Sequence, residues 1–132
     1  MPLPFEFVVY GVPRTLQAKT NSKRAWKAKV SRAASQTWPQ SASKINTEIS
    51  ANVIYFYSND ILDIDNILKP ILDSLDRIIE DDSQISQVLG RKTPINGLVL
   101  QSPSPILASA IQHGGDFVYI ELDGPPDHRT MP

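Results

Sequence analysis

The residues most able to do chemistry in this sequence stand close together near its middle. Asp63 and Asp65 are separated by one residue, which places both carboxylates on the same side of an extended segment. Lys69 and Asp73 follow at steps of four, a spacing that sets them with Asp65 along one face of a helix. The pattern predicts a carboxylate pair, a lysine and a third carboxylate that converge on one patch.

Two adjacent aspartates, Asp81 and Asp82, stand where the same helix is expected to end. Anions beside the negative end of a helix dipole are unfavourable unless a cation compensates them. If the chain folds back here, Asp82 joins Asp63 and Asp65 around a hard divalent ion. Mg²⁺ suits such an oxygen-only site. The expected chemistry is phosphodiester hydrolysis, with Lys69 stabilising charge on the transition state.

The same residues also have an ordinary structural explanation. Acidic side chains are common on the exposed face of an amphipathic helix. Lys69 and Asp73 additionally form the i,i+4 pair that stabilises many helices. The spacing alone therefore leaves open both a metal site and a solvated helix face.

Hydrophobic periodicity predicts the elements that must position these residues. Alternation predicts strands over 5–10, 45–57, 84–92, 98–101 and 117–122, and spacings of three and four predict helices over 23–37 and 64–79. The first helix is expected to take its N-cap from the Thr20-Asn21-Ser22 segment. Residues 102–112 fit neither pattern, and Gly114-Gly115 is expected to form a hairpin turn into the last strand.

The predicted elements indicate an α/β protein of the α+β kind, a single domain over residues 1–132 with a mixed sheet packed by two main helices. Residues 124–132 are expected to form a flexible tail. The chain of 132 residues has the length of one domain. The absence of cysteine excludes a disulfide framework, a thiol nucleophile and a cysteine zinc site.

Neither a membrane span nor a secretory signal is expected, because long apolar runs are lacking and the first residues hold no basic segment. The expected compartment is the cytoplasm.

Charge is distributed unevenly along the chain. Residues 1–47 hold eight Lys and Arg against one Glu, a net charge of +7, whereas residues 48–132 hold five basic and thirteen acidic residues, a net charge of −8. A basic surface beside an acidic centre fits a protein that grips a polyanion and carries a metal, although the charges could merely solvate the surface. The candidate DNA-binding residues are Arg14, Lys19, Lys23, Arg24 and Lys27.

The predicted helix over 23–37 has basic side chains on two sides. Trp26, Val30, Ala33 and Thr37 share the face expected to be buried. Lys23 and Lys27 flank that face on one side, and Lys29 and Arg32 flank it on the other. The helix therefore does not present one basic ridge.

The run from Asp63 to Leu75, followed by Asp81-Asp82-Ser83-Gln84-Ile85, resembles the signature of the RusA-type Holliday junction resolvases. The resemblance covers about residues 60–92, and the Gly11-Val12-Pro13 turn before a basic segment is similar too. It implies a RusA-like fold and a dimeric, Mg²⁺-dependent endonuclease that cuts four-way DNA junctions in recombination and repair. Mn²⁺ is a possible alternative metal.

The resemblance also implies roles for individual residues. The metal ligands it implies are Asp63, Asp65 and Asp82. The catalytic lysine corresponds to Lys69. The supporting polar residues around this site are Asp73, Asp81 and Asn66.

Two other functions fit parts of the same pattern. One is a catalytically idle DNA-binding protein that keeps the fold. The other is an aspartyl-phosphate phosphatase of the haloacid dehalogenase kind, which also uses an Asp-x-Asp pair, a lysine and later aspartates. The phosphatase fold needs several βα units, however, and here Lys69 follows Asp65 too closely.

Overall fold

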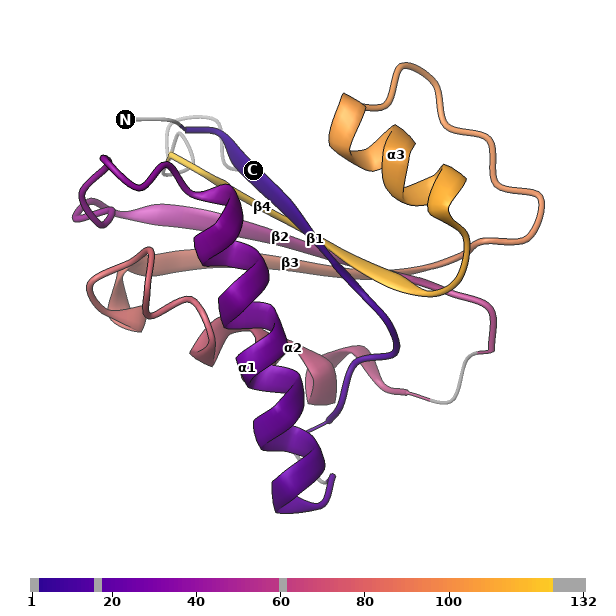
Figure 1. Ribbon diagram of the computed structural model, residues 1–132, viewed down its shortest axis with the longest axis horizontal. Coiled ribbons are helices and arrows are strands. Elements are labelled where there is room, and N and C mark those ends of the chain that lie inside the picture. Colours follow the sequence, from indigo (N-terminus) through magenta and orange to yellow (C-terminus); the bar gives the residue numbers. More distant parts are fainter. Residues whose placement is uncertain (1–2, 16–17, 60–61, 125–132) are drawn as a thin grey trace, which may run out of the picture.

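Four strands form one mixed sheet in the order β1-β4-β2-β3 (Figure 1). The computed structural model describes residues 3–15, 18–59 and 62–124. Its elements are β1 (Phe5–Tyr10), α1 (Thr20–Thr37), β2 (Ile49–Tyr57), α2 (Ile64–Asp73), the 3₁₀ helix η1 (Asp82–Gln84), β3 (Ile85–Pro94), α3 (Pro105–His113) and β4 (Phe117–Asp123). β4 pairs antiparallel with β1 and β2, and β2 pairs parallel with β3.

The predicted α+β class with a mixed sheet is confirmed. The extent of the domain over residues 1–132 stays a prediction, because the expected tail beyond Gly124 lies outside the described residues. None of the helices in the described part of the chain combines the length and the apolar composition that a membrane crossing requires.

The two faces of the sheet carry two separate hydrophobic cores. Alternation along β1 sends Phe5, Phe7 and Val9 into the larger core, which α1 and α2 cover. Val8 and Tyr10 point to the other face, where α3 packs on Phe56, Phe117 and Tyr119 of the sheet. Figure 1 shows α3 standing apart from the other two helices. The larger core therefore positions α2, the helix that carries the candidate site.

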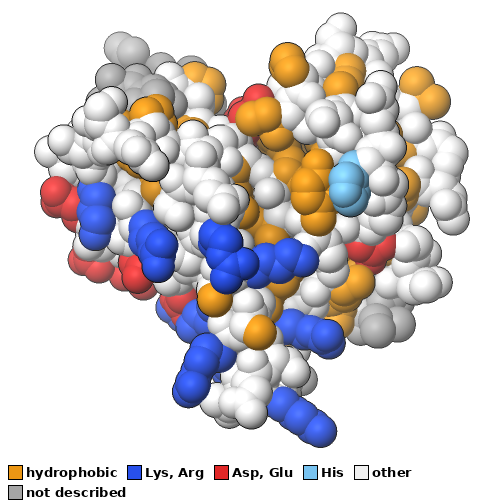
Figure 2. Space-filling model, in the orientation of Figure 1, with side chains coloured by type: hydrophobic (Ala, Val, Ile, Leu, Met, Phe, Trp, Pro, Cys, Tyr) orange, Lys and Arg blue, Asp and Glu red, His pale blue; other side chains and the backbone are white. Residues whose placement is uncertain are grey.

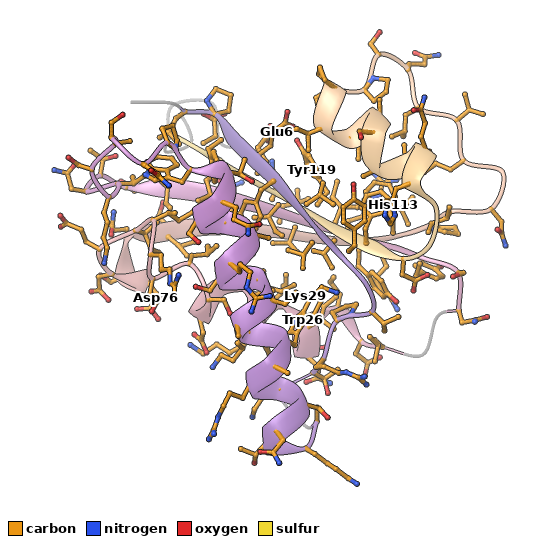
Figure 3. All side chains as sticks on the ribbon, in the orientation of Figure 1. Glu6, Trp26, Lys29, Asp76, His113 and Tyr119 are labelled. Carbon is orange, nitrogen blue, oxygen red and sulfur yellow. The ribbon has the colours of Figure 1, made fainter. Side chains whose placement is uncertain are left out.

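A partly buried network ties α3 to the sheet. Ser104, the N-cap of α3, accepts a hydrogen bond from the Leu107 backbone N–H and donates one to the Glu6 carboxylate. The Tyr119 hydroxyl donates to the same carboxylate, and Figure 3 shows the two residues together. Burial and this hydrogen bond raise the pKa of Tyr119 above its ordinary value. Glu6 thus fastens the start of α3 to β1 and β4.

α1 begins at Thr20, three residues earlier than predicted. Its N-cap is Lys19, whose side chain makes no capping bond, so placing the cap within Thr20-Asn21-Ser22 was wrong. The buried face consists of Trp26, Val30 and Ala34. Ala33 is only partly buried and Thr37 is exposed. The three buried residues are spaced by four, so they lie on one side of the helix.

α2 ends at Asp73, six residues before the predicted end. The Ser74 hydroxyl donates to the Pro70 carbonyl at 2.7 Å, and Ser74 leaves helical geometry at φ −92°, ψ 5°. The predicted apolar positions Leu75, Ile78 and Ile79 are still fully buried or nearly so. Burying each large aliphatic side chain is worth roughly 1.5–3 kcal/mol, so packing holds this segment without a regular helix.

β2 begins at Ile49, whereas the sequence predicted a strand from Ile45. Ile45 forms an isolated parallel bridge with Ile79. Its N–H donates to the Ile78 carbonyl at 2.8 Å, and its carbonyl accepts from the Glu80 N–H at 3.3 Å. Ile45 therefore does pair as a β-residue, but it pairs with the chain after α2 and not with a strand of the sheet.

The segment before β4 differs most from the prediction. Residues 98–101 are irregular and the predicted strand there is wrong, because no described strand pairs with them. α3 occupies most of the segment that fitted neither pattern. Gly114 and Gly115, with φ of +82° each, end this helix and do not form a hairpin turn. Their positive φ values suit glycine alone.

Candidate active site

The start of α2 displays two aspartates to solvent. Asp63 is the N-cap residue with an extended backbone, and Asp65 lies in the first turn. Both side chains are exposed, and the Asp63 carbonyl accepts a hydrogen bond from the Asn66 N–H at 3.1 Å. The helix dipole favours carboxylates at this end. Among the residues that the structure describes, no lysine or arginine pairs with either carboxylate.

A glycine sets how closely α2 approaches the sheet. A Cβ atom on Gly90 of β3 would stand 3.0 Å from side-chain carbons of Ile64 and Leu68, closer than ordinary packing. The Lys92 ammonium donates to the Leu62 carbonyl at 2.8 Å and so holds the segment just before Asp63. β3 therefore fixes the end of α2 that carries the two aspartates.

Lys69 connects α2 with the segment after it. Its ammonium donates to the Asp73 carboxylate at 2.7 Å and lies 3.9 Å from an Asp82 oxygen. The hydrogen bond and charge of Asp73 raise the pKa of Lys69, and the charge of Asp82 adds to this. The chain thus folds back after α2, and Lys69 stands one helical turn from Asp65 with Asp82 beside it.

Asp81 has a structural role next to this cluster. It is the N-cap of η1 and forms a capping box with Gln84, whose side chain accepts from the Asp81 N–H at 2.7 Å. The Ser83 hydroxyl donates to the Asp81 carboxylate at 2.6 Å and lowers the pKa of Asp81. Gln84 also donates to the Ile45 carbonyl at 2.7 Å. Asp81 therefore orients η1, leaving the neighbouring Asp82 exposed.

The candidate site contains the type of ligand atom that a hard divalent cation binds. Asp63, Asp65 and Asp82 are exposed carboxylates, the oxygen ligands that Mg²⁺ takes in proteins. As the side chains lie here, no three acidic or histidine groups within the described ranges converge closely enough to hold a metal ion. Exposed side chains change rotamer on the ps–ns timescale, so packing does not prevent them from converging.

A basic cavity adjoins the cluster between α1 and the turn after α2. It measures about 500 Å³, and its charged lining residues are Lys23, Arg24, Lys27, Asp73, Asp76 and Arg77. Lys27 lies 3.7 Å from Asp73, the residue that also holds Lys69. The cavity thus connects the helix carrying the basic residues with the acidic cluster.

The predicted DNA-binding residues form two groups, those that line the cavity and those that do not. Lys23, Arg24 and Lys27 line it. Arg14 lies instead in a groove on the other side of α1, and Lys19 is exposed at the start of that helix. Sequence reasoning missed Arg77, although its position four residues after Asp73 was a usable signal.

The fold and the site together define a class of protein. It is a small α+β protein with a mixed sheet, whose exposed carboxylate–lysine cluster opens onto a basic cavity. The family described as Endodeoxyribonuclease RusA matches residues 13–97, more than half of the chain. The chain belongs to this family of DNA endonucleases, which confirms the resemblance of its aspartate–lysine pattern. A comparison with curated proteins gave no match.

Proposed function

We propose that this protein is a divalent-metal-dependent endonuclease that resolves four-way DNA junctions by paired phosphodiester hydrolysis. The observation that carries the proposal is Lys69, 2.7 Å from Asp73 and 3.9 Å from Asp82. This contact brings two distant parts of the aspartate–lysine signature together at one surface. The proposed setting is DNA recombination and repair in the cytoplasm.

Asp63, Asp65 and Asp82 would hold the metal, with Mg²⁺ proposed and Mn²⁺ as an alternative. Such an ion polarises a phosphate and makes hydroxide available near neutral pH. All three carboxylates are exposed, so a phosphodiester backbone on the protein surface can reach them. Asn66, partly buried in the same turn, and Asp73 and Asp81 support this arrangement from α2 and η1.

Lys69 is proposed to act on the transition state. Its side chain is about half exposed, and its raised pKa keeps the ammonium charged throughout the physiological range. A fixed cation beside a reacting phosphate stabilises the negative charge that develops there. Asp73 positions this ammonium on one side, and Lys27 approaches the same carboxylate from α1.

The basic cavity is proposed to bind the backbone of the strand that is cut. Four of its charged lining residues are cations and two are anions, and Asp73 is already paired with lysines. The protein is further proposed to act as a homodimer. One chain supplies one acidic cluster, whereas a two-fold junction requires two cuts, and a two-fold dimer presents two sites with matching symmetry.

The decisive experiment measures cleavage of a labelled four-way junction by the wild-type protein. Linear duplex and a small phosphatase substrate serve as parallel substrates. We expect paired cuts in the junction with Mg²⁺, none in excess chelator, and recovery when Mg²⁺ is restored. Full cleavage in excess chelator would rule out the metal-dependent mechanism.

The remaining outcomes separate the alternatives. Tight junction binding without any cleavage in Mg²⁺ or Mn²⁺ would identify an idle DNA-binding protein. Turnover of the small phosphate ester alone would favour the phosphatase. Light scattering should give about twice 14.7 kDa, and a strict monomer that still makes paired cuts would contradict the dimer.

A further inference from the structure

A second basic surface lies on the side of α1 that faces away from the cavity. Two hollows of about 470 and 300 Å³ adjoin there, and Lys29 lines both. We call them together the β1-side groove, whose cations are Arg14, Lys29 and Arg32. Lys27 and Lys29 are two residues apart, which places them on opposite sides of the helix. Figure 2 shows Lys and Arg side chains in a band across this view.

The β1-side groove differs from the cavity in its charge. No acidic residue lines either hollow. Within the ranges that the structure describes, Arg14, Lys29 and Arg32 form no ion pair with a carboxylate. Three cations without acidic neighbours create a positive potential along the groove, and a polyanion is the ligand that such a potential attracts.

The turn after β1 leaves room for the central cation. A Cβ atom on Gly11 would lie 2.9 Å from the Lys29 nitrogen, and Gly11 has a φ of +114°. The glycine therefore lets the ammonium rest directly against the turn. Tyr10, which lines the smaller hollow, immediately precedes this turn. The cation and the aromatic ring thus lie at the same end of β1.

An aromatic pair stands beside these cations. The rings of Tyr10 and His113 lie 4.0 Å apart at 30°, so His113 from the end of α3 covers the tyrosine. His113 is itself exposed. Figure 3 shows Lys29 on α1 and His113 on α3 with β1 between them. His113 lines neither hollow itself, but its exposed ring contacts Tyr10, which lines the smaller hollow together with Lys29 and Arg32.

Cations that follow a backbone, together with an exposed ring, are the features by which proteins bind unpaired nucleic acid. In a duplex the base faces are stacked on their neighbours, so only an unpaired base can stack on His113. The combination therefore favours a single strand over a paired arm.

We infer that the β1-side groove binds a single-stranded DNA segment, with its phosphates on Arg14, Lys29 and Arg32 and a base stacked on His113. The inference rests on the proposed function in taking DNA as the substrate, and it extends that substrate to branched DNA with an unpaired segment. The groove then holds this segment on one side of α1 while the cavity holds the strand that is cut.

The test measures binding of the full-length protein to short oligothymidylate and to a blunt duplex of equal length, at several salt concentrations. In the double variant Lys29→Gln/Arg32→Gln, single-strand affinity should fall at least about tenfold, and by more than duplex affinity. The log–log salt slope should fall by about 1.4, because each single-strand phosphate contact contributes about 0.7. The matched control Lys44→Gln/Arg91→Gln removes two exposed cations elsewhere. It should change neither the single-strand affinity nor the salt slope.

Stacking is tested separately at His113. His113→Ala should weaken oligothymidylate binding at least about fivefold without changing the salt slope. His113→Phe should restore the affinity, because phenylalanine keeps a ring but no charge. Circular dichroism melting of each variant verifies folding, and since all three substituted side chains are exposed, we expect unchanged melting curves.

Three results would overturn the inference: no oligothymidylate binding by the wild type, groove variants that match the control, or equal losses for single strand and duplex. Junction cleavage by the wild-type protein, measured alongside, reports on the proposed function. Cleavage without single-strand binding would reject the groove alone. Single-strand binding that depends on the groove cations, without cleavage in any metal, would support the groove and reject the nuclease proposal.

Discussion

The two sides of α1 carry the same residue types in different surroundings. Lys27 faces α2 and lies 3.7 Å from Asp73, within a cavity that also contains Asp76. Lys29, two residues later, rests against the turn at Gly11 in a groove without acidic lining. One lysine belongs to a network of opposite charges, whereas the other has cations as its charged neighbours.

The comparison shows that the role of a surface lysine is set by what the fold places opposite it. On the α2 side, Asp73 lies between Lys27 and Lys69, so the cations there are aligned with an acidic cluster. On the β1 side, the positive potential remains available for a ligand. The first arrangement suits chemistry at a phosphate, and the second suits binding of a strand.

The largest expected effect comes from removing a carboxylate of the acidic cluster. Asp65→Asn should lower junction cleavage at least about 10²-fold, because changing even the neighbours of a metal ligand costs 10- to 100-fold. Without metal, its junction affinity should equal or exceed that of wild type, since one repulsive charge is removed. Cleavage assays and gel shifts measure the two quantities, and Asp123→Asn is the control. If Asp65→Asn lost junction binding in the absence of metal, the acidic cluster would have a structural role and not a catalytic one.

The next effect concerns the lysine between the carboxylates. Lys69→Ala should lower the single-turnover cleavage rate by roughly 10²-fold or more, with little change in junction affinity, because its charge acts mainly on the transition state. Rapid-quench assays at saturating protein measure the rate. If the only change were weaker binding that recovers at low salt, Lys69 would be an ordinary phosphate contact.

A smaller effect tests the two sides of α1 directly. Lys27→Gln should weaken duplex binding and reduce its salt slope by up to about one, as expected for one lost phosphate contact. It should also slow cleavage, because Asp73 loses a partner. Lys29→Gln should weaken single-strand binding more than duplex binding. Equal effects of both variants on both substrates would remove the distinction between the two sides.

The smallest expected effect lies at the sheet end that positions β1 and β4. Desolvation would raise the pKa of Asp116, but hydrogen bonds from Ser58 and Tyr55 outweigh it and lower the pKa below its ordinary value. Ionised Asp116 therefore stabilises the fold above the unfolded pKa of about 3.9. This contribution is lost as the pH falls through the folded pKa.

In the wild-type protein, the free energy of unfolding should therefore decrease as the pH falls below about 4.5. In Asp116→Asn this decrease should be smaller, because the substituted side chain no longer titrates. Urea titrations at a series of pH values measure it, with Asp123→Asn as an exposed control. The change should be modest because solvent partly screens this partly exposed group. An unchanged acid profile would show that the hydrogen bonds to Asp116 do not favour its charged form in solution.

Local patterns in the sequence predicted most of the regular elements. Alternation located β1 at its observed bounds and found β3 and β4 within two residues at each end. These signals work for β1 and β4 because each of these strands buries one face or more, whereas β3 has no buried residue. The predictions failed where a distant residue supplied the partner: Ile45 pairs with the chain after α2, and residues 98–101 have no strand to join.

The candidate site was predictable in its residue types and only partly in its geometry. The steps of four from Asp65 to Lys69 and Asp73 are local, so helix periodicity places them on one face. The approach of Asp82 to Lys69 and of Lys27 to Asp73 depends on how the chain folds back and on how α1 packs. Arg77, by contrast, was missed although its spacing of four residues from Asp73 is local.

By itself, the sequence determined the α+β class, the helix that carries Asp65 and Lys69, and the basic character of α1. Its local periodicities are enough for this, because they fix which face of each element is apolar. Only the tertiary structure decided that Lys27 lies near Asp73, while Lys29 lies against Gly11 in a groove that Tyr10 also lines. Side chains on opposite sides of one helix look alike in a sequence, and the elements packed on each side give them different neighbours.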